Sequence, residues 1–126
     1  MAKYIDGFVL VIPKGKEAEY EEMAKMGKES WMRHGALQYF ETRGDDLKQQ
    51  EMGDLKSRAC KEMAGASEDD NVRFSFIVFN SKEHRDEVNK KVMEEMNEAF
   101  DGEASFEMPN DMTKMAYGGF EVVVEG

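Results

Sequence analysis

Apolar positions along this chain follow two periods, and the first of them indicates strands. Residues 4–12 end in five consecutive apolar residues and stop at Pro13, which lacks the N–H group that a strand ladder needs. Residues 72–79 carry apolar side chains on both faces of an extended chain. Both segments are therefore predicted to be strands covered on both faces. Shorter strands are predicted at 36–41 and 115–125.

The second period is helical. Residues 16–34 place their apolar residues on one stripe, which consists of Tyr20, Met23, Ala24, Gly27 and Trp31. A second helix is predicted to follow Ser81, a good N-cap residue, and to run to Phe100. The polar stretch 45–71 is predicted to be a linker, with a short strand or helical turn around 55–63.

These elements occur in the order strand, helix, strand, linker, strand, helix, strand. Two such units with crossover helices predict an α+β fold of ferredoxin-like β-α-β-β-α-β topology, with sheet order 4-1-3-2 and both helices on one face. A single domain over residues 1–126 is expected, because neither side of the linker is large enough to fold alone.

The predicted helices leave one face of the predicted sheet uncovered. Two helices cover one face of a four-stranded sheet, but the strands are apolar on both faces, so a monomer would expose roughly several hundred Å² of apolar surface. We therefore expect a homodimer in which two sheets pack face to face about a two-fold axis. The alternative is that the linker, residues 45–71, folds over this face.

Composition narrows the choice of partners and compartment. The chain has 27 Asp and Glu against 17 Lys and Arg, and its net charge of −10 repels nucleic acids and anionic lipids. A lone cysteine, Cys60, excludes an internal disulfide and suits a reducing compartment. No apolar run approaches the ~20 residues that span a bilayer, and the N-terminus does not resemble a secretion signal. We expect a cytoplasmic protein that binds neither nucleic acid nor membrane.

Carboxylates at strand ends are the first candidates for a functional site. If the start of the first strand lies near the ends of the second and fourth, one rim of the sheet gathers Asp6, Asp45, Asp46 and Glu121. Clustered carboxylates hold hard divalent cations or raise one another's pKa for acid–base work. The alternative is structural: Asp45 and Asp46 shape a turn, and Asp6 caps backbone amides near Gly7.

A pocket between the sheet and the helices is the second candidate. Its expected lining residues are Trp31, His34, Tyr39, Glu41 and Tyr117. Packing in the core is the alternative for the aromatic residues, and His34 at a helix C-terminus also suits the helix dipole. The sequence has no closely spaced histidine pair, no neighbouring Cys and His, and no nucleophile elbow, so neither a metal nor a cofactor is predicted.

Several stretches resemble the YbaA-like family of small uncharacterised bacterial proteins, members of the dimeric α+β barrel group. They are Tyr4-Ile5-Asp6-Gly7-Phe8-Val9, Gly35-Ala36-Leu37, Gly44-Asp45-Asp46, Phe74-Ser75, Ser81-Lys82-Glu83 with Arg85-Asp86, and Met115 with Tyr117-Gly118-Gly119-Phe120-Glu121. The sequence departs from the family pattern at Thr42-Arg43, where an aromatic residue commonly precedes the Gly-Asp-Asp.

The resemblance implies the same fold and dimer, and it implies no activity. We expect a protein that binds a small ligand in a pocket between sheet and helices. The alternative, by analogy with other members of the fold group, is a cofactor-independent enzyme of the monooxygenase type. Its acid–base residues would come from Asp6, Glu41, Asp45, Asp46 and His34.

Overall fold

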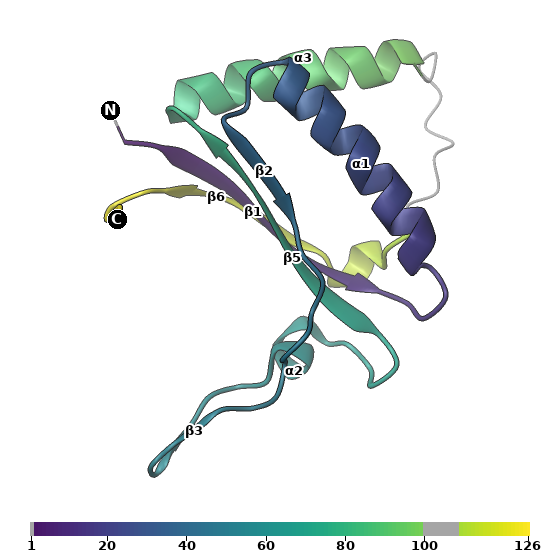
Figure 1. Cartoon of the computed structure of the whole chain (residues 1–126), viewed down its shortest axis with the longest axis vertical. Coiled ribbons are helices and arrows are strands. Elements are labelled where there is room, and N and C mark those ends of the chain that lie inside the picture. The colour runs from purple at the N-terminus through teal and green to yellow at the C-terminus, as the bar shows by residue number, and fades with distance from the viewer. Residues whose placement is uncertain (1, 100–108) are drawn as a thin grey trace.

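The computed structural model describes residues 2–99 and 109–126 of the chain (Figure 1). In chain order its elements are β1 (Tyr4–Ile12), α1 (Glu17–Arg33), β2 (Gln38–Glu41), β3 (Glu51–Met52), β4 (Leu55–Lys56), α2 (Cys60–Ala64), β5 (Asn71–Phe79), α3 (Lys82–Ala99), the 3₁₀ helix η1 (Met112–Lys114) and β6 (Ala116–Glu121). The protein is therefore α+β, as predicted.

A four-stranded sheet organises the molecule. Its order is β2-β5-β1-β6, and every pair of neighbours is antiparallel. This is the predicted strand order. The helices α1 and α3 lie over the same face of the sheet, whereas the β3–β4 hairpin projects away from one end of it (Figure 1). The sheet is open, and its edges are β2 and β6.

A glycine after α1 and a capping serine before α3 determine where these two helices end and begin. After α1 the chain turns at Gly35, whose φ of 112° lies in the region that favours glycine. At the start of α3 the Ser81 hydroxyl accepts a hydrogen bond of 3.1 Å from the backbone N–H of His84. The cap predicted at Ser81 is therefore confirmed. The predicted end of this helix at Phe100 lies outside the described residues, and the last strand ends at Glu121 rather than at 125.

The core lies between the sheet and the two long helices. One buried cluster joins β5 and α3 and consists of Ala36, Ile77, Phe79, Val88 and Val92. The other joins β1 and α1 and consists of Leu10, Ile12, Tyr20 and Ala24. The predicted α1 stripe faces this core, with Tyr20, Ala24 and Gly27 buried. None of the described helices is long and apolar enough to cross a membrane.

The opposite face of the sheet carries exposed aromatic side chains. Phe40, Phe74 and Phe120 are 44%, 52% and 61% exposed. The rings of Phe40 and Phe74 both pack on Phe76, with centroid distances of 4.9 and 5.5 Å. The linker covers one end of this face only, where α2 contacts β1 and β5 and where Val11 and Val72 are buried. Most of the face therefore remains open in a single chain.

Candidate functional site

The predicted rim of carboxylates does not form, because two of its members lie at the other end of the sheet. Both β1 and β2 are antiparallel to β5, so they run in the same direction. Glu121 lies opposite Tyr4, at the start of β1. The end of β2 instead points toward the end of β1. The prediction placed the end of the second strand near the start of the first, and this was wrong.

Asp45 and Asp46 follow Gly44, which is fixed at the far end of the sheet. The Gly44 carbonyl accepts a hydrogen bond of 3.1 Å from Asn71, and Asn71 lies opposite Ile12, the last residue of β1. Within residues 2–99 and 109–126, no group of three or more His, Cys, Asp or Glu side chains is close enough to hold a metal ion.

Asp6 is part of a closed ion-pair cluster between β1 and α3. Its side chain is almost fully buried, and its two oxygens accept from Arg85 Nη1 at 2.8 Å and Asn89 Nδ2 at 3.1 Å. Arg85 Nη1 also donates to the Tyr117 hydroxyl at 3.1 Å, and burial raises the pKa of Tyr117. Trp31 Nε1 donates to Asn89 Oδ1 at 2.9 Å. Three predicted site residues thus meet in one network, with both oxygens of the carboxylate already bonded.

His34 joins the ends of α1 and α3. Its Nε2 lies 2.9 Å from Glu95 Oε2, and Glu95 also accepts hydrogen bonds from Ser30 and Arg33. The hydrogen bond from the Ser30 hydroxyl is the main reason that the pKa of Glu95 is lowered to about 2. His34 therefore takes part in a polar link between the two helices.

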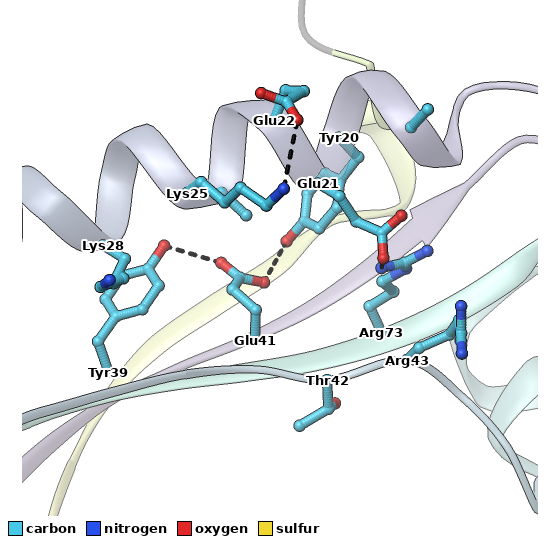
Figure 2. Close-up of a pocket in the computed structure, with 12 residues that line it drawn as sticks. Tyr20, Glu21, Glu22, Lys25, Lys28, Tyr39, Glu41, Thr42, Arg43 and Arg73 are labelled. Atoms are coloured by element: carbon cyan, nitrogen blue, oxygen red, sulfur yellow. Dashed lines mark hydrogen bonds and ion pairs between the residues drawn. The ribbon is translucent and has the colours of Figure 1, made fainter.

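Tyr39 and Glu41 line a cleft of about 630 Å³ between α1 and the strands β2 and β5 (Figure 2). They are two residues apart on β2, so their side chains lie on the same face of the sheet, toward α1. Gly27 allows α1 to approach this face, because a Cβ atom there would lie 3.0 Å from the Tyr39 hydroxyl. The cleft thus lies between sheet and helix, the location expected for a ligand pocket by analogy with the fold group.

Three hydroxyl groups hold the Glu41 carboxylate in this cleft. Tyr39 donates to Oε1 at 2.8 Å and Tyr20 donates to Oε2 at 2.7 Å, as Figure 2 shows. Ser75, which lies opposite Glu41 in the strand register, also donates to Oε2. Glu41 nevertheless remains exposed. Its donors are neutral, and among the described residues no basic side chain forms an ion pair with it.

Burial raises the pKa of Tyr20 and of Tyr39 well above the ordinary value of 10.0, and the negative charge of Glu41 raises both further. Both hydroxyl groups therefore keep their protons at neutral pH and act as donors to the carboxylate. The side chain of Glu41 is consequently held in one orientation by its hydroxyl donors.

The cleft also contains basic side chains that the sequence did not single out. Lys25, Lys28 and Arg43 line it at its surface, and Arg73 lines it from β5. The Arg73 guanidinium lies over the Tyr20 ring, 5.3 Å from its centroid. The signal that could have found Arg73 is its position: it is a charged residue in a strand that is otherwise predicted to be covered on both faces.

The raised tyrosine pKa values predict a loss of stability at alkaline pH. Above pH 10 the unfolded chain ionises Tyr20 and Tyr39 and the folded chain does not, so the free energy of unfolding falls as pH rises. In Glu41→Gln we expect the pKa of Tyr39 to fall toward its ordinary value, because a negative neighbour is lost. A spectrophotometric titration of tyrosinate absorbance measures this. Glu87→Gln, on the exposed face of α3, is the control and should titrate as wild type does.

An antiparallel sheet with two long helices on one face and a cleft beneath α1 defines this chain as a small α+β protein with a candidate ligand cleft. Residues 3–111 match the family described as "Protein of unknown function (DUF1428)", and the chain belongs to this family. It is 37% identical over 123 residues to the "Uncharacterized protein YbaA" of Escherichia coli (strain K12), covering 98% of both chains, and equally so to that of Shigella flexneri. The resemblance predicted from the sequence is confirmed.

Among solved structures the chain is similar to a de novo designed protein, Foldit4. The TM-score is 0.43 with 6% sequence identity, covering 98% of this chain and 99% of the other.

Proposed function

We propose that the chain is a single ferredoxin-like domain that forms a homodimer, with two sheets packed face to face as a dimeric α+β barrel. The strand order and the two helices on one face support this topology. The exposed phenylalanines of the open face support the dimer, because a second copy would remove this surface from water. We place the dimer in the cytoplasm, since Cys60 is an exposed free thiol and such a thiol persists in a reducing compartment.

We further propose that each protomer binds a small polar ligand in the cleft between α1, β2 and β5. The observation that supports this most directly is Glu41, a charged carboxylate that three hydroxyl groups orient but that remains exposed in the cleft. Asp6 and Glu95 differ, because basic partners already bond to them. A side chain oriented before the ligand arrives loses little conformational entropy on binding.

A second candidate function, the monooxygenase-type enzyme, has no observation in its favour. Of its five candidate acid–base residues, Glu41 alone lines the cleft. Asp6 is paired with Arg85, and His34 is bound to Glu95. Asp45 and Asp46 lie near the opposite end of the sheet from Asp6.

Native mass spectrometry of untagged protein, purified gently from its own cells, tests the ligand proposal. We expect a dimer that carries one small-molecule adduct per chain. In Glu41→Gln the adduct should be lost or greatly reduced, because the charged acceptor is gone, whereas Glu87→Gln should retain it. A dimer that stays bare, also after incubation with a small-molecule extract of the same cells, would contradict ligand binding in this cleft.

A further inference from the structure

Arg73 lines the cleft, and one hydrogen-bonding edge of its guanidinium is buried without a partner, so that a ligand reaches it only when the side chains over it move aside. Its side chain is 3% exposed, and Nη1 lies 3.6 Å from Glu21 Oε1. Nε and Nη2 are buried and have no hydrogen-bond partner in the part of the chain that the structure describes. Charged donors that are buried without a partner are costly, and they are rare in folded proteins. These two N–H groups are therefore the ones that a bound oxygen acceptor would satisfy.

The two unpaired groups belong to one side of the guanidinium. In arginine, Nε–H and one N–H of Nη2 point in parallel from the same edge of a rigid plane. The spacing of these two donors matches the two oxygens of a carboxylate, which accepts both hydrogen bonds at once. Nη1 is directed toward Glu21, and one face of the guanidinium plane lies over the Tyr20 ring. The free edge is thus the edge that binds oxyanions best.

Charge favours a group with a single negative charge. The cleft is lined by four basic side chains, Lys25, Lys28, Arg43 and Arg73, and by three acidic ones, Glu21, Glu22 and Glu41, which leaves a net charge of +1. A monoanion balances this charge. A phosphate dianion would exceed it, and it would lie close to three carboxylates that repel it.

Tyr20 connects the two ends of the cleft. Its hydroxyl donates to Glu41 and its ring lies under the Arg73 guanidinium (Figure 2). A ligand that spans this distance meets two donors at one end and a charged acceptor at the other. The arrangement fits a compound with an acidic group and, a few atoms away, an amine or hydroxyl group.

We propose that Arg73 is the anion-binding residue of the cleft and that the ligand carries a carboxylate, which accepts hydrogen bonds from Nε and Nη2. This rests on the proposed function and specifies the class of its ligand. The hydrogen-bond donor of the same ligand is directed to Glu41. Arg73 is then held in place by Glu21 and Tyr20 in order to present its free edge.

The Arg73 Nε–Hε signal in ¹H–¹⁵N NMR spectra of the wild-type protein tests this directly. Acetate is the probe, because a small carboxylate requires the least movement of the side chains that cover Nε and Nη2, and ionic strength is held constant with chloride. We expect acetate to shift the Arg73 signal in a saturable manner. Acetamide, its neutral isostere, should not shift the signal. The Nε–Hε signal of Arg85 is the internal control, because that group already donates to Asp86 at 2.8 Å.

Arg73→Lys separates the paired hydrogen bonds from charge alone. Lysine keeps the positive charge but lacks the planar edge, so we expect acetate to bind about tenfold more weakly. Arg43→Lys, at the surface of the same cleft, should change the affinity far less. If Arg73→Lys does not fold, the wild-type titration decides alone.

Three outcomes overturn the assignment: an Arg73 signal that acetate does not move, an equal response to acetamide, or inorganic phosphate binding as tightly as acetate. If native mass spectrometry nevertheless finds a Glu41-dependent adduct, the cleft binds a ligand and only the carboxylate assignment fails. If the adduct is also missing, the proposed function fails with it.

Discussion

Phe74→Asp is expected to convert a dimer of twice the 14.4 kDa chain mass into a monomer. Phe74 lies at the centre of the open face, opposite Val9 in the strand register. In a single chain its ring is half exposed, so an aspartate there costs little. Between two sheets the carboxylate would be buried without a partner, at a cost of about 3–5 kcal/mol. Light scattering coupled to size-exclusion chromatography measures the mass.

Leu55→Asp is the matched control for the dimer. Leu55 is also apolar and is 70% exposed, but it lies on the projecting hairpin and not on the sheet. Its replacement should leave the mass unchanged. A Phe74→Asp protein that is still a dimer, or a wild-type protein that is monomeric, would rule out the face-to-face arrangement.

Arg85→Met is expected to lower the free energy of unfolding by about 3–5 kcal/mol, because it leaves the Asp6 carboxylate buried without its charge partner. Asp6 is 1% exposed, and Arg85 Nη1 lies 2.8 Å from its Oδ1. Methionine keeps much of the length and apolar volume of the side chain, so the loss of charge dominates the effect. Urea unfolding followed by circular dichroism gives the value.

Asp86→Asn controls for the second partner of Arg85. Its side chain is 60% exposed, and exposed ion pairs contribute at most about 1 kcal/mol. Combining Asp6→Asn with Arg85→Met removes the unpaired buried charge and should recover part of the stability. A loss below about 1 kcal/mol in Arg85→Met alone would mean that the unpaired carboxylate finds another partner or water.

The elements and the sheet order could be predicted because they depend on local patterns. Five consecutive apolar residues before Pro13, and the alternation of Phe74, Ser75 and Phe76, indicate which strands are central and which way their side chains point. The same two-residue period explains why Tyr39 and Glu41 share one face of β2. The open aromatic face also followed from it.

The partners of the site residues could not be predicted, since they are distant in the sequence. Asp6 and Arg85 are 79 positions apart, and no local pattern joins them. Arg73 was overlooked because the other residues of its strand are mostly apolar, and the whole segment was therefore interpreted as part of the core. The carboxylate rim failed for a different reason: the direction of β2 was assigned wrongly, so that Asp45 and Asp46 were placed near Asp6.

The strand order has a consequence for any cut or insertion in the β3–β4 hairpin. Residues before the hairpin provide β1 and β2 to the four-stranded sheet, and residues after it provide β5 and β6. Each pairing in this sheet, β2 with β5, β5 with β1 and β1 with β6, joins one half of the chain to the other. Neither half contains a strand pair of this sheet, so neither half can form the sheet without the other. The hairpin at Gly53 is accordingly the natural position at which to divide the protein into two complementing fragments.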